Sequence, residues 1–88
     1  MDAIKLLDSL EVGIPLIVVI KWLGVPTRRK VTLYAGTRGD GIYNFIDDTG
    51  VYGMTTGYIR ERCHISRELD QDDLYELMLL CNKVKEVK

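Results

Sequence analysis

The chain has 88 residues, of which 47% are hydrophobic and 28% charged, and its formal net charge is −1. This length allows one domain around one modest core, and the near-neutral charge argues against a strongly cationic nucleic-acid binder. Two cysteines are too few for a disulfide framework, and no apolar run approaches the length of a membrane span. We therefore expect a single-domain cytoplasmic protein with reduced thiols and no membrane contact.

The first two segments predict a short helix followed by a strand. Asp2 can cap a helix over residues 2–11, whose apolar residues Ala3, Leu6, Leu7 and Leu10 lie at helical spacing. Residues 14–22 include the β-branched run Ile17-Val18-Val19-Ile20, which favours a strand covered on both faces and packed under this helix. One longer buried helix that starts at Pro15 is the alternative interpretation of this segment.

The next segments are short and are separated by turn residues. Gly24 and Pro26 indicate an interruption over residues 23–29. Residues 30–37 alternate in polarity, with Val31, Leu33 and Ala35 on one face, which predicts a half-buried strand. Because Tyr34 lies on the opposite face, we expect its side chain to face solvent.

Two further strands and an ambiguous segment follow. We predict strands at residues 42–47 and 51–54, after a glycine turn at residues 38–41 and with a hairpin turn at residues 48–50 between them. Residues 58–63 fit either a helical turn or a last strand that ends at Ile65.

The last third of the chain predicts an amphipathic helix. Asp70 is the expected cap, and the predicted apolar face consists of Leu74, Leu77, Met78, Cys81 and Val84. Acidic residues lie in the first turn and lysines at the end, as the helix dipole favours. The arc of Leu79, Leu80 and Val84 exceeds what one sheet can cover, which is compatible with a homodimer.

Together these elements indicate an α+β domain. We expect a small curled antiparallel sheet or an open barrel, flanked by a short N-terminal helix and an amphipathic C-terminal helix. The stretch of residues 30–65, with its glycine-rich turn, its Asp47-Asp48-Thr49-Gly50 hairpin and Tyr58-Ile59 after a break, resembles the later strands of SH3-like small barrels. The size of the chain also resembles that of small phage and prophage proteins.

Groups that could perform catalysis or bind a metal are poorly arranged in the sequence. Cys63, His64 and Cys81 offer three potential metal ligands, but the chain has no C-x-x-C pair. Cys63 and His64 are adjacent, so on a strand they would point to opposite faces. The glycines do not match a phosphate-binding loop. We therefore expect neither enzymatic activity nor a metal or other cofactor.

Two functional hypotheses follow. The first is a non-enzymatic protein-binding module, for example a small phage-encoded inhibitor or adaptor, because tyrosine and tryptophan are enriched at interfaces. The second is a nucleic-acid-binding protein, because residues 21–67 contain eight Lys or Arg and four Asp or Glu. The candidate residues for protein binding, on the outer face of the sheet, are Trp22, Arg28, Arg29, Tyr34, Tyr43, Tyr58 and Arg60. The candidate residues for nucleic-acid binding are Lys21, Arg28, Arg29, Lys30, Arg38, Arg60 and Arg62.

Overall fold

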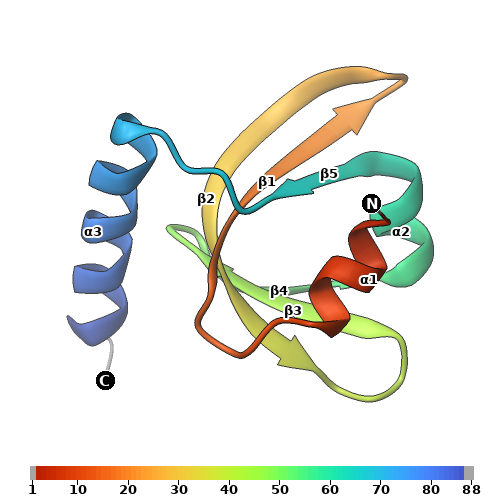
Figure 1. The fold of residues 1–88 in the computed structure, drawn as a ribbon, viewed down its shortest axis with the longest axis horizontal. Coiled ribbons are helices and arrows are strands. Elements are labelled where there is room, and N and C mark those ends of the chain that lie inside the picture. Colours follow the sequence, from red (N-terminus) through yellow and green to blue (C-terminus); the bar gives the residue numbers. More distant parts are fainter. Residues whose placement is uncertain (1, 87–88) are drawn as a thin grey trace.

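A five-stranded antiparallel sheet, curled but not closed, forms the body of the molecule, with two short helices, α1 and α2, next to each other at its open side and a longer helix on the opposite side (Figure 1). The computed structural model describes residues 2–86, and the α+β class predicted from the sequence is confirmed. The elements in chain order are α1 (Ala3–Asp8), β1 (Pro15–Trp22), β2 (Val25–Thr37), β3 (Ile42–Asp47), β4 (Gly50–Thr55), α2 (Thr56–Arg62), β5 (Cys63–Ser66) and α3 (Gln71–Glu86).

The strands lie in the order β4-β3-β2-β1-β5, so β1 is an inner strand. Val18 pairs with Lys30 of β2 on one side and with Ile65 of β5 on the other. The strand predicted at residues 14–22 is therefore confirmed, and the alternative of a buried helix is wrong. β4 and β5 form the two edges of the sheet, and α2 connects them, an arrangement compatible with an SH3-like fold.

The hairpin between β1 and β2 is tighter than the sequence suggests. The predicted interruption at residues 23–29 is wrong, because only Leu23 and Gly24 form the turn and β2 begins at Val25. Both turn residues have positive φ, 51° and 79°, as two-residue hairpin loops that follow the strand twist require. Pro26 fits within β2 because the register shifts beside it and this end of β2 pairs with β1 alone.

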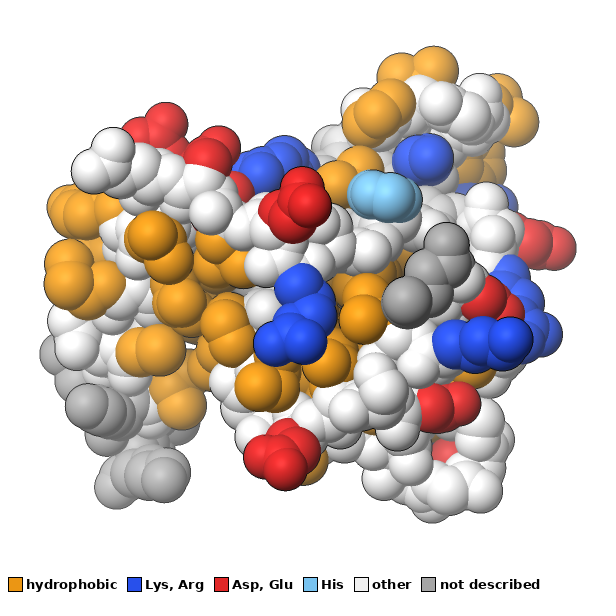
Figure 2. Space-filling view, in the orientation of Figure 1, with side chains coloured by type: hydrophobic (Ala, Val, Ile, Leu, Met, Phe, Trp, Pro, Cys, Tyr) orange, Lys and Arg blue, Asp and Glu red, His pale blue; other side chains and the backbone are white. Residues whose placement is uncertain are grey.

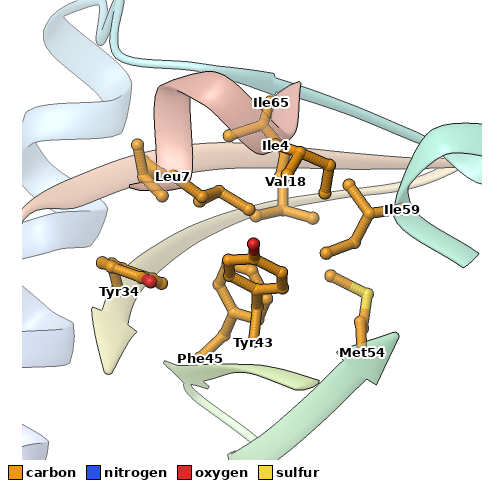
Figure 3. Packing of buried hydrophobic residues seen from close by; sticks show 10 residues of the cluster. Ile4, Leu7, Val18, Tyr34, Tyr43, Phe45, Met54, Ile59 and Ile65 are labelled. Carbon is orange, nitrogen blue, oxygen red and sulfur yellow. The ribbon is translucent and has the colours of Figure 1, made fainter. Parts of the chain in front are cut away.

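The core fills the concave side of the sheet under α1 (Figure 3). Tyr34 and Tyr43 point into this core, and the ring of Tyr34 lies 5.9 Å from that of Phe45. The expectation that Tyr34 faces solvent is wrong, because the curled sheet leaves the middle of β2 without a solvent face. The buried cluster consists of Ile4, Leu7, Leu16, Val18, Tyr34, Tyr43, Phe45, Met54, Ile59 and Ile65.

Short polar contacts set the ends of several elements. Asp2 caps α1 by accepting from the Ile4 amide at 3.1 Å, as predicted. In the predicted hairpin turn after β3, the Asp47 carboxylate accepts from the Thr49 amide at 2.8 Å. Thr55 caps α2 in the same manner as Asp2 caps α1. The ambiguous segment at residues 58–63 thus lies mostly in α2, and β5 follows it.

α3 packs against the outer face of β2 (Figure 1). It begins at Gln71 after Asp70, close to the predicted start, and the predicted apolar face is confirmed in part, because Leu77, Cys81 and Val84 are half-buried. Leu74 and Met78 are exposed, whereas Asp73 and Leu80 are buried. The reason is an ion pair between Arg29 and Asp73, which turns the Asp73 side of the helix toward the sheet. Within residues 2–86, none of the helices combines the length and apolarity needed to cross a membrane.

Candidate functional site

A groove runs along the open side of the sheet, between β4 and the β1–β2 hairpin. Its volume is about 430 Å³, and it exists because β4 does not close against β1 and β2. Side chains of β1, β2, β4 and α2 all line it. The lining residues are Ile20, Arg28, Thr49, Tyr52, Gly53, Met54, Thr55 and Tyr58. We call this feature the open-side groove.

One wall of the open-side groove is the edge strand β4. Within the described residues, β4 pairs with β3 along its whole length, from Gly50 to Thr55, and with no other strand. An edge strand presents a row of backbone N–H and C=O groups that can pair with another chain. This wall can therefore offer main-chain hydrogen bonds to an extended segment.

Exposed apolar and aromatic groups of the β1–β2 hairpin lie near the lining residue Tyr58, because Arg62 contacts both Tyr58 and Trp22. Trp22 is 54% exposed and the hairpin-turn residue Leu23 is 88% exposed, with the exposed Val25 beside them. The guanidinium carbon of Arg62 lies 4.3 Å from the centroid of the Trp22 ring and 5.8 Å from that of Tyr58. These distances are within the range of cation–π attraction, so Arg62 holds the two rings near one another. We call Trp22, Tyr58 and Arg62 the aromatic–arginine cluster.

An ion pair with one buried partner lies in the wall of the groove. Arg28 contacts Asp47 at 2.5 Å, and the Asp47 side chain is fully buried. The Arg28 guanidinium also lies 5.7 Å from the centroid of the Tyr52 ring. Burial raises the pKa of Tyr52 to about 12, so its hydroxyl stays protonated at neutral pH. Because Asp47 offsets the charge of Arg28, the groove is polar here without a strong net charge.

The structure brings together some of the residues predicted for protein binding and separates others. Trp22, Arg28 and Tyr58 lie in or beside the open-side groove. Tyr34 and Tyr43 lie in the core, so they do not belong to an outer surface. Two further predicted residues are elsewhere: Arg29 is paired with Asp73 of α3, and Arg60 lies 3.5 Å from Asp2.

The basic residues predicted for nucleic-acid binding are distributed over the molecule. Arg28 contacts Asp47, Arg29 contacts Asp73, Lys30 contacts Asp48 and Arg60 contacts Asp2. Arg62 stacks on Trp22, Lys21 lies near the end of β1, and Arg38 follows β2. Figure 2 shows the same mixture on one face, where Lys and Arg alternate with Asp and Glu. The described residues do not form a continuous cationic surface from this set.

The environments of Cys63, His64 and Asp47 do not favour catalysis. Cys63 is partly buried near Met54, and burial raises its pKa to about 11, which disfavours the nucleophilic thiolate. His64, the next residue of β5, is exposed. Asp47 is occupied by Arg28 and by the Thr49 turn. Among the described residues, no three His, Cys, Asp or Glu side chains converge as they would around a metal ion.

Sequence analysis missed the open-side groove and the contacts of Arg62 with Trp22 and Tyr58. Arg62 lies four residues after Tyr58 on α2, a spacing that places both on one side of a helix and could have indicated their contact. The contact with Trp22 could not be inferred in this way, because it depends on the pairing of β1 with β5. Ile20 and Tyr52 line the groove through the curl of the sheet rather than through a sequence pattern.

Comparison with known proteins returned no match: no family model, no curated protein and no solved structure is similar to this chain at the significance applied.

Proposed function

We propose that this chain is a non-enzymatic protein-binding module that receives an extended segment of a partner protein in the open-side groove. The observation that carries this proposal is that an edge strand, β4, lines the groove together with Tyr58 of the exposed aromatic–arginine cluster. Such a module would act as an inhibitor or adaptor by occupying the partner's segment.

The groove offers both components of strand-addition binding. Main-chain hydrogen bonds to a sheet edge supply affinity, and neighbouring side-chain sites supply specificity. The backbone of β4 would provide the first, while Tyr58 and the neighbouring Trp22 would contact apolar side chains of the segment. Trp and Tyr are suited to this role because they bury a large area at a small cost in side-chain entropy.

The topology of the sheet concerns the architecture of this module. β5 returns to pair with β1, and a helix separates β4 from β5, as an SH3-like barrel would require. We therefore propose that the sheet is an open SH3-like barrel. The fold itself does not specify a function, so the argument rests on the groove.

The test uses a displayed library of linear peptides selected on the purified protein. Selected peptides should bind the wild-type chain and lose about tenfold or more in affinity to Trp22→Ala or Tyr58→Ala, because each change removes an aromatic anchor. Tyr75→Ala is the matched control, since Tyr75 is also an exposed aromatic residue but lies on α3. Binding should also slow hydrogen exchange at the amides of β4.

Selection of no binding peptide would refute the proposal, as would peptides that bind the two groove variants as well as they bind the wild type.

Fluorescence anisotropy with short DNA and RNA tests the nucleic-acid hypothesis. An affinity for nucleic acid that falls ~10-fold or more between about 50 and 200 mM salt would support that hypothesis instead. We favour protein binding because Arg28, Arg29 and Lys30 each contact a carboxylate.

A further inference from the structure

Arg62 is a half-buried arginine at the end of α2 that has aromatic rings, rather than a carboxylate, as its neighbours. Every other arginine in the strands and in α2 contacts an aspartate. Between residues 2 and 86, no carboxylate forms an ion pair with Arg62, although Glu61 directly precedes it. Its guanidinium lies instead over the rings of Trp22 and Tyr58. Within the described chain, the positive charge of Arg62 is therefore not offset by a contact.

Stacking on a ring leaves the hydrogen-bond donors of Arg62 available. An aromatic ring contacts the flat face of a guanidinium, whereas the N–H groups lie in its plane and point outward. Their fork matches the two oxygens of a carboxylate. Trp22 and Tyr58 are both exposed, so a ligand can reach this cluster from solvent. Because the rings hold the guanidinium in place, a carboxylate would bind it at a lower cost in side-chain entropy than at a mobile arginine.

The open-side groove leads to this arginine along the edge of β4. Four consecutive residues of β4, from Tyr52 to Thr55, line the groove. Because neighbouring side chains of a strand point to opposite faces, a hollow over one face would be lined by alternate residues only. α2 begins directly after Thr55, and Tyr58 in its first turn also lines the groove. A segment paired with β4 would therefore reach Tyr58, and with it Arg62, at the Thr55 end of the strand.

Charge is distributed unevenly along this path. Among the residues that line the groove, Arg28 alone is charged, and its contact with Asp47 offsets that charge. The positive charge of Arg62 is offset by no such contact and lies at the Thr55 end. Complementary charges across an interface fix the register of a partner and exclude wrong partners more than they add affinity. The groove is therefore suited to a segment that is negative at one end and uncharged along the rest.

We propose that Arg62 selects an extended segment that carries a carboxylate, from Asp or Glu, at the end beside Thr55. Apolar side chains of the segment would lie along the groove against Tyr52 and Met54. The carboxylate would accept hydrogen bonds from the guanidinium of Arg62. This inference rests on the proposed function and adds to it the chemistry of the segment and its register.

Peptides selected on the purified protein test this inference. The selected sequences should share an Asp or Glu, and its replacement with Asn or Gln should weaken binding about tenfold or more, because a charged hydrogen bond is lost. Arg62→Gln should bind the acidic and the neutral peptide with equal affinity. Arg62→Lys should recover only part of the preference, because an ammonium group lacks the planar fork. Titration calorimetry measures each affinity, and circular dichroism verifies that each variant is folded.

Arg67→Gln is the matched control. Arg67 also forms no ion pair within residues 2–86, but it follows β5, whereas Arg62 precedes that strand. The two arginines thus lie at opposite ends of β5, and Arg67→Gln should keep the full preference for the acidic peptide.

Two results would overturn this inference and leave the proposed function intact. One is a set of selected peptides whose acidic residue can be replaced without loss of affinity. The other is an Arg62→Gln variant that still prefers the acidic peptide by the wild-type factor, which would mean that Arg62 only holds the rings of Trp22 and Tyr58. In both cases the peptides would still bind in the groove. Selection of no peptide would instead overturn the proposed function and this inference with it.

Discussion

The hydroxyl of Tyr43 connects β3 to α1, and removing it tests how that helix is held on the sheet. Tyr43 is buried and donates to the Asp8 carboxylate at 2.7 Å. This bond and burial both raise the pKa of Tyr43. Tyr43→Phe deletes the hydrogen bond and keeps the ring in the core.

The structure sets the size of the effect. A hydrogen bond to a charged group contributes about 1.5–3 kcal/mol when its loss leaves a partner unsatisfied. Asp8 is exposed, so water can solvate its carboxylate in the variant, and the expected loss is only about 1 kcal/mol. For a domain of this length, that corresponds to a decrease in Tm of about 4–8 °C.

Thermal and urea unfolding, followed by circular dichroism, measure this loss. Asp8→Ala should cost less than Tyr43→Phe, because Asp8 ends α1, where a negative charge opposes the helix dipole. A double-mutant cycle of the two changes should give a coupling of about 1 kcal/mol. Tyr58→Phe serves as the exposed control and should leave the Tm unchanged. A coupling near zero would refute the argument that this bond holds α1.

Three other predictions concern sterics, charge and thiol chemistry. Gly53→Ala should destabilise the fold by about 1–3 kcal/mol in urea unfolding, because its Cβ would lie 2.8 Å from Ile42 Cγ2. Gly57→Ala is the matched control in open space on α2, and a loss of similar size there would contradict the steric explanation. Arg29 lowers the pKa of Asp73 to about 2 from its ordinary 3.8, so the stability it contributes is complete above about pH 4 and is lost as the pH falls toward 2. Acid titration of unfolding should show this loss in the wild type and a flatter profile in Asp73→Asn; identical profiles would rule out the linkage. Iodoacetamide at about pH 8 should modify Cys63 far more slowly in the folded chain than in urea, because burial raises its pKa to about 11, and equal rates would count against that burial.

Elements whose signals are local could be predicted from the sequence. The Asp2 cap, the hairpin turn after Asp47 and the start of α3 each depend on residues within a few positions of one another. The strand at residues 42–47 has the predicted bounds because one of its faces is buried and its residues alternate. In these places, the local preferences agree with the tertiary structure.

Features that depend on residues far apart in the sequence were not predicted. Alternation assumes one solvent face, and Tyr34 violates it because β2 lies between the core and α3. The rotation of α3 follows from the pairing of Asp73 with Arg29, which helical periodicity does not reveal. Tyr43→Ala, a natural test of the predicted binding surface, would instead remove a core ring at a cost of about 3–5 kcal/mol.

Trp22, Arg28 and Tyr58 were predicted as site residues, but the groove beside them was not. It arises where β4 does not pair with the β1–β2 hairpin. A hydrophobicity pattern does not predict whether a sheet closes. Arg62 was assigned to the nucleic-acid hypothesis because only its charge was visible in the sequence. In the structure, the guanidinium of Arg62 lies over the Trp22 ring instead of within a continuous basic surface.

The turn between β3 and β4 connects the open-side groove with the support of α3. Thr49 lines the groove, and Lys83 of α3 donates to the carbonyl oxygen of the neighbouring Asp48 at 2.7 Å. Thr49 also borders a second hollow together with Leu80 and Lys83 of α3. A segment that bound the groove and shifted this turn would therefore change the support of α3, so the position of the helix would report whether the groove is occupied.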